Sequence, residues 1–255
     1  MSLGLVIAVV LIALIFTYIN GFHDTANSIA TVVATKVLTP GQAVLLAAVT
    51  NMVGALWGTA VAATIAAGIV NTSVVEAGSQ LLICALLSAI VWNLITWWLG
   101  LPSSSSHALV GALVGAAIAE SGGRLAAVIW AQGGAHWWEG KGVLPKVVVP
   151  MVMSPIMGFV LGFLLMGGLY ALLAWFASRK GFLRYLGRTP FVNSFFGKAQ
   201  ILTASAMGLA HGMNDAQKSM GIIALALASA TAAGDFDQMP RWLSLDRRAS
   251  CRERV

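Results

Sequence analysis

Residues 147–178 read V-V-V-P-M-V-M-S-P-I-M-G-F-V-L-G-F-L-L-M-G-G-L-Y-A-L-L-A-W-F-A-S, with no charged side chain among them. A helix needs roughly 20 apolar residues to span a bilayer, and this stretch exceeds that length. Residues 37–75 and 77–119 form two more long stretches without Asp, Glu, Lys or Arg. These stretches predict membrane-spanning helices rather than the helices of a soluble core.

The composition of the whole chain indicates the same class of protein. Of the 255 residues, 58% are hydrophobic and 9% are charged, whereas roughly a quarter of the residues in a soluble domain are charged. The N-terminal residues 1–18 contain no Lys or Arg, so they lack the basic start of a secretory signal. We predict an all-α, polytopic protein of the cytoplasmic membrane whose first helix is retained.

Apolar segments divide the chain into six predicted passes. They cover residues 3–38, 43–67, 81–99, 103–119, 147–177 and 200–232. The loop between the fifth and sixth passes is basic without acidic residues, which places it in the cytoplasm. The positive charge behind the net charge of +6 therefore indicates how the helices are oriented in the membrane, and we expect no nucleic-acid partner. By parity, the first pass runs inward and the sixth runs outward.

The first and sixth passes carry a related motif. Residues 21–30 read G-F-H-D-T-A-N-S-I-A and residues 212–221 read G-M-N-D-A-Q-K-S-M-G, so that Gly, Asp and Ser coincide. Both passes are too long for one straight crossing at about 1.5 Å per residue, and we expect each helix to break at its motif. Two broken helices in opposite orientation predict an inverted-topology repeat.

Asp24 and Asp215 are the only aspartates before residue 234, and they share one motif position. An ionised carboxylate at membrane depth costs several kcal/mol, so it persists where it faces water, a cation or a partner. Near a helix break it could serve an anion and a coupling ion together. A structural salt bridge with Lys218 is the alternative. Further polar residues in the two motifs are Asn20, His23, Asn27, His211, Asn214 and Gln217.

A third polar cluster, L-P-S-S-S-S-H at residues 101–107, lies between two apolar segments. Pro102 ends the preceding helix, and one Ser suffices to cap the next. Ser103, Ser104, Ser105 and Ser106 exceed that need, and His107 follows them. Hydroxyl and N–H groups at a helix N-terminus suit a tetrahedral oxyanion. No ligand spacing indicates a zinc site, and we expect neither a resident metal nor a cofactor.

The chain resembles the inorganic phosphate transporter (PiT) family, in its bacterial type, through three motifs: N-G-F-H-D-T-A-N-S-I-A-T from Asn20, P-S-S-S-S-H-A-L-V-G from Pro102 and H-G-M-N-D-A-Q-K-S-M-G from His211. The resemblance implies a symporter of inorganic phosphate with a Ser-rich re-entrant hairpin. It assigns substrate binding to Asp24, Asn27, Ser103, Ser104, Ser105, Ser106, Asn214 and Asp215. We expect coupling-ion or auxiliary roles for Asn20, His23, His107, His211, Gln217 and Lys218.

The coupling ion implied by the family is H⁺ or Na⁺. His23 stands where the family usually has Asn, and imidazole is a poor ligand for a hard cation. Lys218 adds a positive charge nearby, so the sequence favours protons. The expected partners are the lipid bilayer and inorganic phosphate, alone or complexed with a divalent metal, and the sequence is compatible with a homo-oligomer.

Two other functions stay open from the residues alone. An anion channel could share the same inverted repeat, and an intramembrane hydrolase could use the Ser, His and Asp side chains. Four consecutive serines and duplicated aspartates favour transport, so we expect no enzymatic activity.

The domain organisation follows from the passes. We expect a first transmembrane repeat at 1–177, a basic cytoplasmic loop at 178–199 and the start of a second repeat at 200–233. The charged residues 234–255 are expected to be a non-native or disordered tail. The second Ser-rich hairpin of an inverted repeat should follow the sixth pass, and the chain stops being hydrophobic before it, so we expect a fragment of a longer transporter. Small-residue pairs at Gly54 and Gly58, and at Gly111 and Gly115, predict close helix packing.

Overall fold

The computed structural model describes residues 3–57, 68–71, 73–75, 78–134, 136 and 138–232. Its helices are α1 (Leu3–Ala34), α2 (Pro40–Ala55), α4 (Ser79–Trp98), α5 (Ser105–Glu120), α6 (Val149–Ser178), α7 (Phe182–Leu186) and α8 (Thr189–Ala232). A 3₁₀ turn at Leu125–Ala127 and a π-helical turn at Leu144–Val148 lie between α5 and α6. The described part of the chain has no β-strand beyond isolated one-residue bridges, which confirms the all-α prediction.

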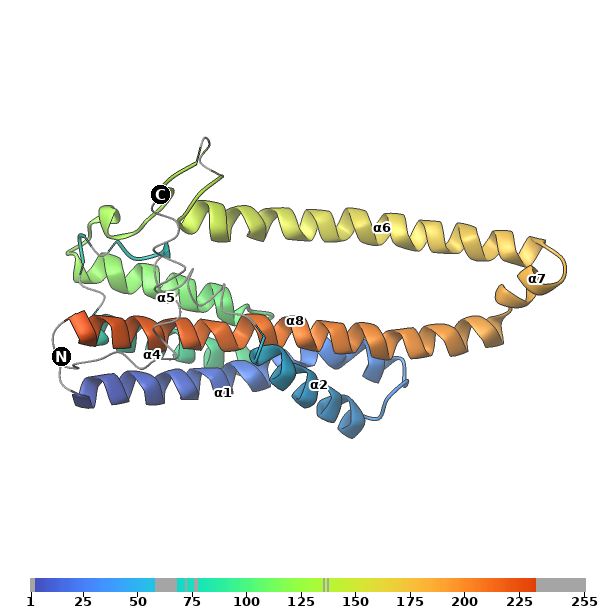
Figure 1. The fold of residues 1–255 in the computed structure, drawn as a ribbon, viewed down its shortest axis with the longest axis horizontal. Helices are drawn as coiled ribbons and strands as arrows, with labels where there is room; N and C mark the ends of the chain where they lie inside the picture. Colours follow the sequence, from blue (N-terminus) through green and yellow to red (C-terminus); the bar gives the residue numbers. More distant parts are fainter. Residues whose placement is uncertain are drawn as a thin grey trace.

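The helices form a bundle with a long arm (Figure 1). In the bundle, α8 packs against α1 and α2, and α4 packs against α1 and α5. Apolar side chains fill the space between these helices, and the fully buried ones include Val9, Phe16, Leu82, Leu86, Leu109, Leu113 and Ile222. The arm consists of α6, α7 and the first half of α8 (Figure 1).

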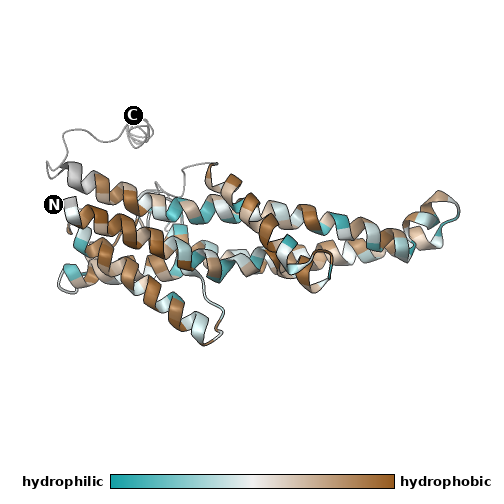
Figure 2. Ribbon diagram, turned by 90° about the horizontal axis from the view of Figure 1, so that it is seen from below, coloured by the Kyte–Doolittle hydropathy of each residue, from teal (hydrophilic) through white to brown (hydrophobic). Residues whose placement is uncertain are grey.

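Three of the helical segments are long and apolar enough to cross a membrane. They are Gly4–Ala34, Ser79–Trp98 and Leu144–Ser178, whereas Pro40–Ala55 and Ser105–Glu120 are apolar but shorter. The second predicted pass extends to residue 67, and residues 58–67 lie outside the described part of the chain. Hydrophobic residues dominate the end of the bundle that holds the N-terminus (Figure 2).

Helices α1 and α8 run through both motifs without interruption, for 32 and 44 residues respectively. The predicted breaks are therefore wrong. The prediction rested on the length of the two passes, which exceeds one straight crossing. A 32-residue helix is about 48 Å long and can tilt or project beyond a bilayer core of about 30 Å.

The course of α1 and α8 is antiparallel. Thr17 Oγ1 lies 2.6 Å from Ser219 Oγ, and Thr35 Oγ1 donates to Gln200 Oε1 at 2.7 Å, so residue numbers rise along one helix as they fall along the other. An inverted repeat requires this orientation of its two motifs. The repeat itself stays a prediction.

The Ser-rich segment is the tip of a helical hairpin formed by α4 and α5, which pack against each other. The Ser104 hydroxyl accepts a bond of 3.4 Å from His107 N and caps α5. Pro102, which lacks an N–H, stands in the turn between the two helices. The hairpin is observed as expected, and its re-entrant insertion into a membrane stays a prediction.

Glycines let α2 and α8 approach closely. A Cβ at Gly54 would clash with the backbone of Leu209, and one at Gly212 would clash with the backbone of Asn51. Gly111 and Gly115 have open space at the Cβ position, so the close packing predicted for that pair is wrong, and Gly58 lies outside the described residues. The close contact that requires small residues is therefore the one between α2 and α8, beside the second motif.

The arm contains the segment predicted as a basic loop at 178–199. Residues of α6 are not buried anywhere along its length. At the tip, the Arg179 guanidinium lies 4.7 Å from the centre of the Trp175 ring. Helix α8 begins at Thr189 rather than near residue 200, and α7 also lies within this range, so most of the expected loop is helical. The expected tail, 234–255, lies outside the described residues.

Candidate substrate and coupling-ion site

The two motif aspartates come together where α1 crosses α8. Oxygen atoms of Asp24 and Asp215 and a ring nitrogen of His211 all lie within 4.8 Å of one another. Asn20 Nδ2 donates to Asp215 Oδ2 at 2.9 Å. Asn20 and His211 occupy the same motif position, four residues before each aspartate. Asp215 therefore bonds to the residue of the first motif that corresponds to His211 in the second.

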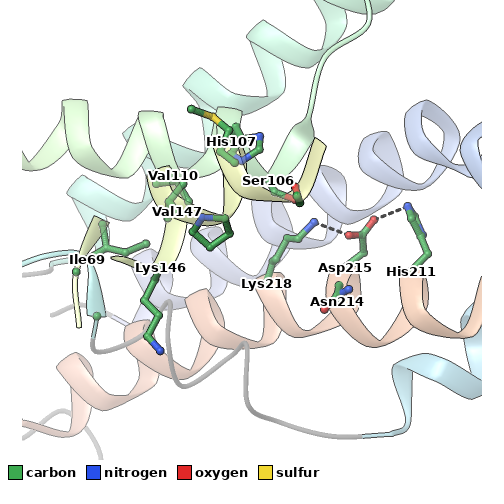
Figure 3. A pocket seen from close by; sticks show the side chains of 15 residues that line it. Ile69, Ser106, His107, Val110, Lys146, Val147, His211, Asn214, Asp215 and Lys218 are labelled. Carbon is green, nitrogen blue, oxygen red and sulfur yellow. Dashed lines mark hydrogen bonds and ion pairs between the residues drawn. The ribbon is translucent and has the colours of Figure 1, made fainter. Parts of the chain in front are cut away.

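Asp215 lies between two potentially cationic side chains of its own helix (Figure 3). The Lys218 ammonium forms an ion pair with Oδ1, and His211 Nε2 is 3.0 Å from Oδ2. The salt bridge considered as an alternative therefore exists. It lines a cavity instead of being sealed in a core, so it is compatible with a binding role as well.

Asp24 contacts an imidazole and a hydroxyl instead of a lysine. His23 Nδ1 lies 3.1 Å from Asp24 Oδ1, and Ser105 Oγ lies 2.6 Å from Asp24 Oδ2. The same Ser105 hydroxyl also contacts Asn20 Oδ1 and is fully buried. Ser105 thus connects the hairpin tip to the motif of α1.

The four consecutive serines have four different surroundings. Trp92 Nε1 donates to Ser103 Oγ at 3.2 Å, Ser104 caps α5, and Ser105 joins the aspartate network. Ser106 lines a cavity beside Lys218. The structure therefore brings two of the four, Ser105 and Ser106, to the candidate site.

Two cavities meet at the aspartate cluster. The first, of about 510 Å³, is lined by Ser106, His107, His211, Asn214, Asp215 and Lys218 among others (Figure 3). The second, of about 310 Å³, lies on the other side and is lined by Thr17, Asn20, Gly21, Asn51, His211 and Asp215 among others. His211 and Asp215 line both cavities, so they form part of the wall between them.

Two predicted site residues lie outside the cluster. Asn27 is exposed, because the buried stripe of α1 at this level is Asn20, Asp24 and Ser28, spaced by four residues. Gln217 Nε2 donates to the carbonyl of Trp57 at the end of α2, over 3.5 Å. Asn27 belongs to neither of the two cavities described above.

Other residues of the site were missed from the sequence. Asn51 of α2 holds the second nitrogen of His211: its Oδ1 lies 2.8 Å from Nδ1. Lys146 lines the larger cavity, although its ammonium points away from Asp215 (Figure 3). An amide inside the apolar stretch 37–75 is the signal that could have identified Asn51, since such a group needs a partner at membrane depth.

Asp24, His211 and Asp215 have the donor atoms and proximity of a metal site. Their hydrogen bonds do not suit one, however. The Lys218 ammonium already contacts Asp215 Oδ1, and the Asn20 amide donates to Oδ2. A divalent ion would have to displace Lys218. The arrangement therefore suits the ammonium of this lysine better than a bound metal ion.

The sequence profile of the phosphate transporter family matches residues 20–246 of the chain. The chain belongs to this family. The match confirms the resemblance drawn from the three motifs. It also extends past residue 234, into the segment expected to be a tail.

Three bacterial transporters are similar to this chain. A probable low-affinity inorganic phosphate transporter of Bacillus subtilis is 45% identical over 239 residues, which cover 94% of this chain and 65% of that protein. One of Streptomyces halstedii is 44% identical, with 84% of this chain and 88% of that protein covered. The low-affinity inorganic phosphate transporter PitA of Escherichia coli is 34% identical, with 87% and 45% covered. The chain thus spans less than two thirds of the Bacillus and Escherichia relatives.

A solved structure shares the fold. It is described as the sodium-dependent phosphate transporter, is 21% identical and superposes with a TM-score of 0.62 over 94% of this chain and 72% of that one. Together with the three apolar helices long enough to cross a bilayer, membership of the family identifies a multi-pass membrane protein.

Proposed function

We propose that this protein is a secondary active symporter of inorganic phosphate and that protons drive it. The observation that carries the proposal is the proximity of Asp24 and Asp215 across α1 and α8, because Asp215 lies in a wall shared by two cavities. A site that lies between two cavities can be opened to either side in turn. The names of the relatives support phosphate as the cargo.

Phosphate would bind in the larger cavity. Lys218 supplies a positive charge there, while Ser106 and Asn214 supply neutral donors from α5 and α8. Phosphate near pH 7 still carries a proton that a carboxylate can accept, whereas sulfate offers acceptors alone. Asp215, on the same wall, would provide that discrimination.

Protons are favoured over sodium by the groups around the aspartates. His23 and His211 are both within hydrogen-bond distance of a carboxylate oxygen, and an imidazole is a weak ligand for Na⁺. The Lys218 ammonium already neutralises Asp215. The sodium-dependent protein with the same fold makes Na⁺ the alternative to be tested.

Uptake of radiolabelled phosphate into liposomes that contain the full-length protein tests the function. We expect accumulation above the external concentration under an inward proton gradient, and loss of that accumulation when a protonophore is added. Accumulation under a sodium gradient alone would contradict proton coupling. Phosphate flow that never exceeds equilibration would indicate an anion channel.

The form of the cargo needs a separate measurement. Uptake with Mg²⁺ present or chelated, and uptake of a labelled divalent metal, distinguish free phosphate from a neutral metal–phosphate complex. We propose free phosphate as the main cargo, because Lys218 would repel a metal bound to phosphate in the same cavity. Equal, mutually dependent uptake of metal and phosphate would contradict this.

A further inference from the structure

Hydrogen bonds around His211 fix the positions of its protons. Asn51 Nδ2 donates to the carbonyl of Ala47 at 2.7 Å, so the amide oxygen must be the atom that faces His211 Nδ1 at 2.8 Å. The opposite orientation would place two acceptors against each other at Ala47. An amide oxygen can only accept, so Nδ1 of His211 carries a hydrogen.

The other ring nitrogen then requires a second proton. Nε2 lies 3.0 Å from Asp215 Oδ2. A neutral ring with hydrogen on Nδ1 would present a lone pair from Nε2 to a carboxylate oxygen, which is repulsive. One proton must therefore lie between these two atoms.

The remaining partners of Asp215 decide which atom holds this proton. Oδ1 forms the ion pair with Lys218, and Oδ2 accepts from the Asn20 amide. Both contacts stabilise the ionised carboxylate. The proton therefore belongs to the ring, as an imidazolium paired with Asp215.

We infer that His211 Nε2 holds the coupling proton and that Asn51 is the residue that positions the ring for it. The inference rests on the proposed proton-driven transport, and it adds the atom and the positioning residue. His211 lines both cavities, so a proton can bind to Nε2 from water on one side and leave to water on the other. The N–H bond that forms and breaks involves no other reactant.

Several charged or titratable groups face His211. They are Asp24 and His23 on α1, His107 on α5, Asp215 and Lys218 on α8, and Lys146 at the rim of the larger cavity. The two carboxylates favour the imidazolium, and Lys218 opposes it. Asn51 is the residue of α2 that contacts the ring, and it is neutral, so substitutions there change its bonds to the ring and to the Ala47 carbonyl and leave the charged or titratable groups named above in place.

Two substitutions of Asn51 should move the pH dependence of phosphate uptake in opposite directions. Asn51→Leu removes the acceptor that orients Nδ1–H, and the midpoint of the pH profile should fall by about one pH unit, as loss of a hydrogen bond to a charged group implies. Asn51→Asp places a carboxylate at Nδ1, and the midpoint should rise by about as much. Thr50→Val is the matched control, since Thr50 bonds to its own helix and touches α8 without contacting the ring.

Direct observation of the ring separates this inference from the proposed function. In ¹⁵N NMR of imidazole-labelled protein, the signal lost in His211→Gln should show both nitrogens protonated at neutral pH, and Asn51→Leu should move its titration to lower pH. A neutral His211 at pH 7, or identical profiles for both Asn51 variants and the control, would overturn the inference. If instead uptake needs sodium while the NMR result holds, the proposed coupling fails and the proton assignment stands.

Discussion

The two copies of the motif use the same residues in different surroundings. In the second copy, Lys218 is buried against Asp215, and in the first copy the corresponding residue is Asn27, which is exposed. Asp24 instead contacts Ser105 of the hairpin and the ring of His23. One aspartate is therefore held by the ammonium of a lysine, and the other by a hydroxyl and a neighbouring imidazole. A duplicated motif has thus produced two sites with different electrostatics.

Neutralising each aspartate in turn is the strongest test of this electrostatic difference between the two copies. Asp215→Asn leaves the ammonium of Lys218, a residue only 6% exposed, without its counter-ion. Breaking a buried pair in this way should lower the free energy of unfolding by about 3–5 kcal/mol and abolish uptake. Asp24→Asn keeps the shape and leaves no buried lysine without its counter-ion, so it should lower the free energy of unfolding by about 1 kcal/mol.

Thermal and denaturant unfolding in detergent would measure both variants. The double variant Asp215→Asn, Lys218→Met removes both charges and should recover part of the stability lost in Asp215→Asn. Equal destabilisation by the two single substitutions would mean that the ion pair contributes nothing that distinguishes the copies.

The next largest effect should come from Gly212→Ala, which changes the packing next to the second copy. The added methyl group would clash with the backbone of Asn51, which cannot rotate away as a side chain could. Overpacking of this kind costs about 1–3 kcal/mol, and it should also separate His211 from Asn51 and reduce uptake. Gly115→Ala is the matched control, because open space surrounds that position.

The result would be read from unfolding midpoints and phosphate uptake measured on the same preparations. We expect a loss in both for Gly212→Ala and no loss in either for Gly115→Ala. Normal stability of Gly212→Ala would show that α2 and α8 can separate without cost, and that the second copy does not depend on their contact.

The sequence contained enough to predict the helical class, the hairpin tip and the meeting of Asp24 with Asp215. Long apolar stretches allow little but helices in a membrane, because every backbone group must be satisfied within its own segment. The shared motif position marked both aspartates as candidate site residues, since a carboxylate at membrane depth persists only where it faces water, a cation or a partner.

Other features depend on contacts between distant segments and could not be predicted in the same way. The helices stay unbroken because Asn20 and Ser105 satisfy the aspartates through side chains, which no local pattern reveals. Asn27 and Lys218 share a motif position, yet Asn27 is exposed and Lys218 is buried. This difference depends on which other helices pack against α1 and α8. Asn51 is far from both motifs in sequence, and only the fold places it at His211.

A substitution of Ser105 tests the surroundings of Asp24 in the first copy of the motif. Ser105→Ala removes the hydroxyl shared by Asn20 and Asp24 and leaves two buried oxygens without that partner. The expected loss of stability is about 1–3 kcal/mol, with a clear reduction in phosphate uptake. The exposed Ser88 of α4 gives a control, Ser88→Ala, that should change neither quantity. Wild-type uptake by Ser105→Ala would show that the hairpin tip does not take part in the site.

The smallest expected effect concerns Asn93 of α4, whose fully buried amide has no hydrogen-bond partner among the described residues. A buried amide without a partner opposes folding, and replacing it with an apolar side chain of similar size is neutral or stabilising. Asn93→Leu should therefore raise the free energy of unfolding by up to about 1 kcal/mol and leave uptake intact. If the variant is more stable but no longer transports, Asn93 finds its partner in another state of the transport cycle. The hydrogen-bond network around Asp24 would then extend into α4, while the ion pair of Asp215 and Lys218 stays within α8.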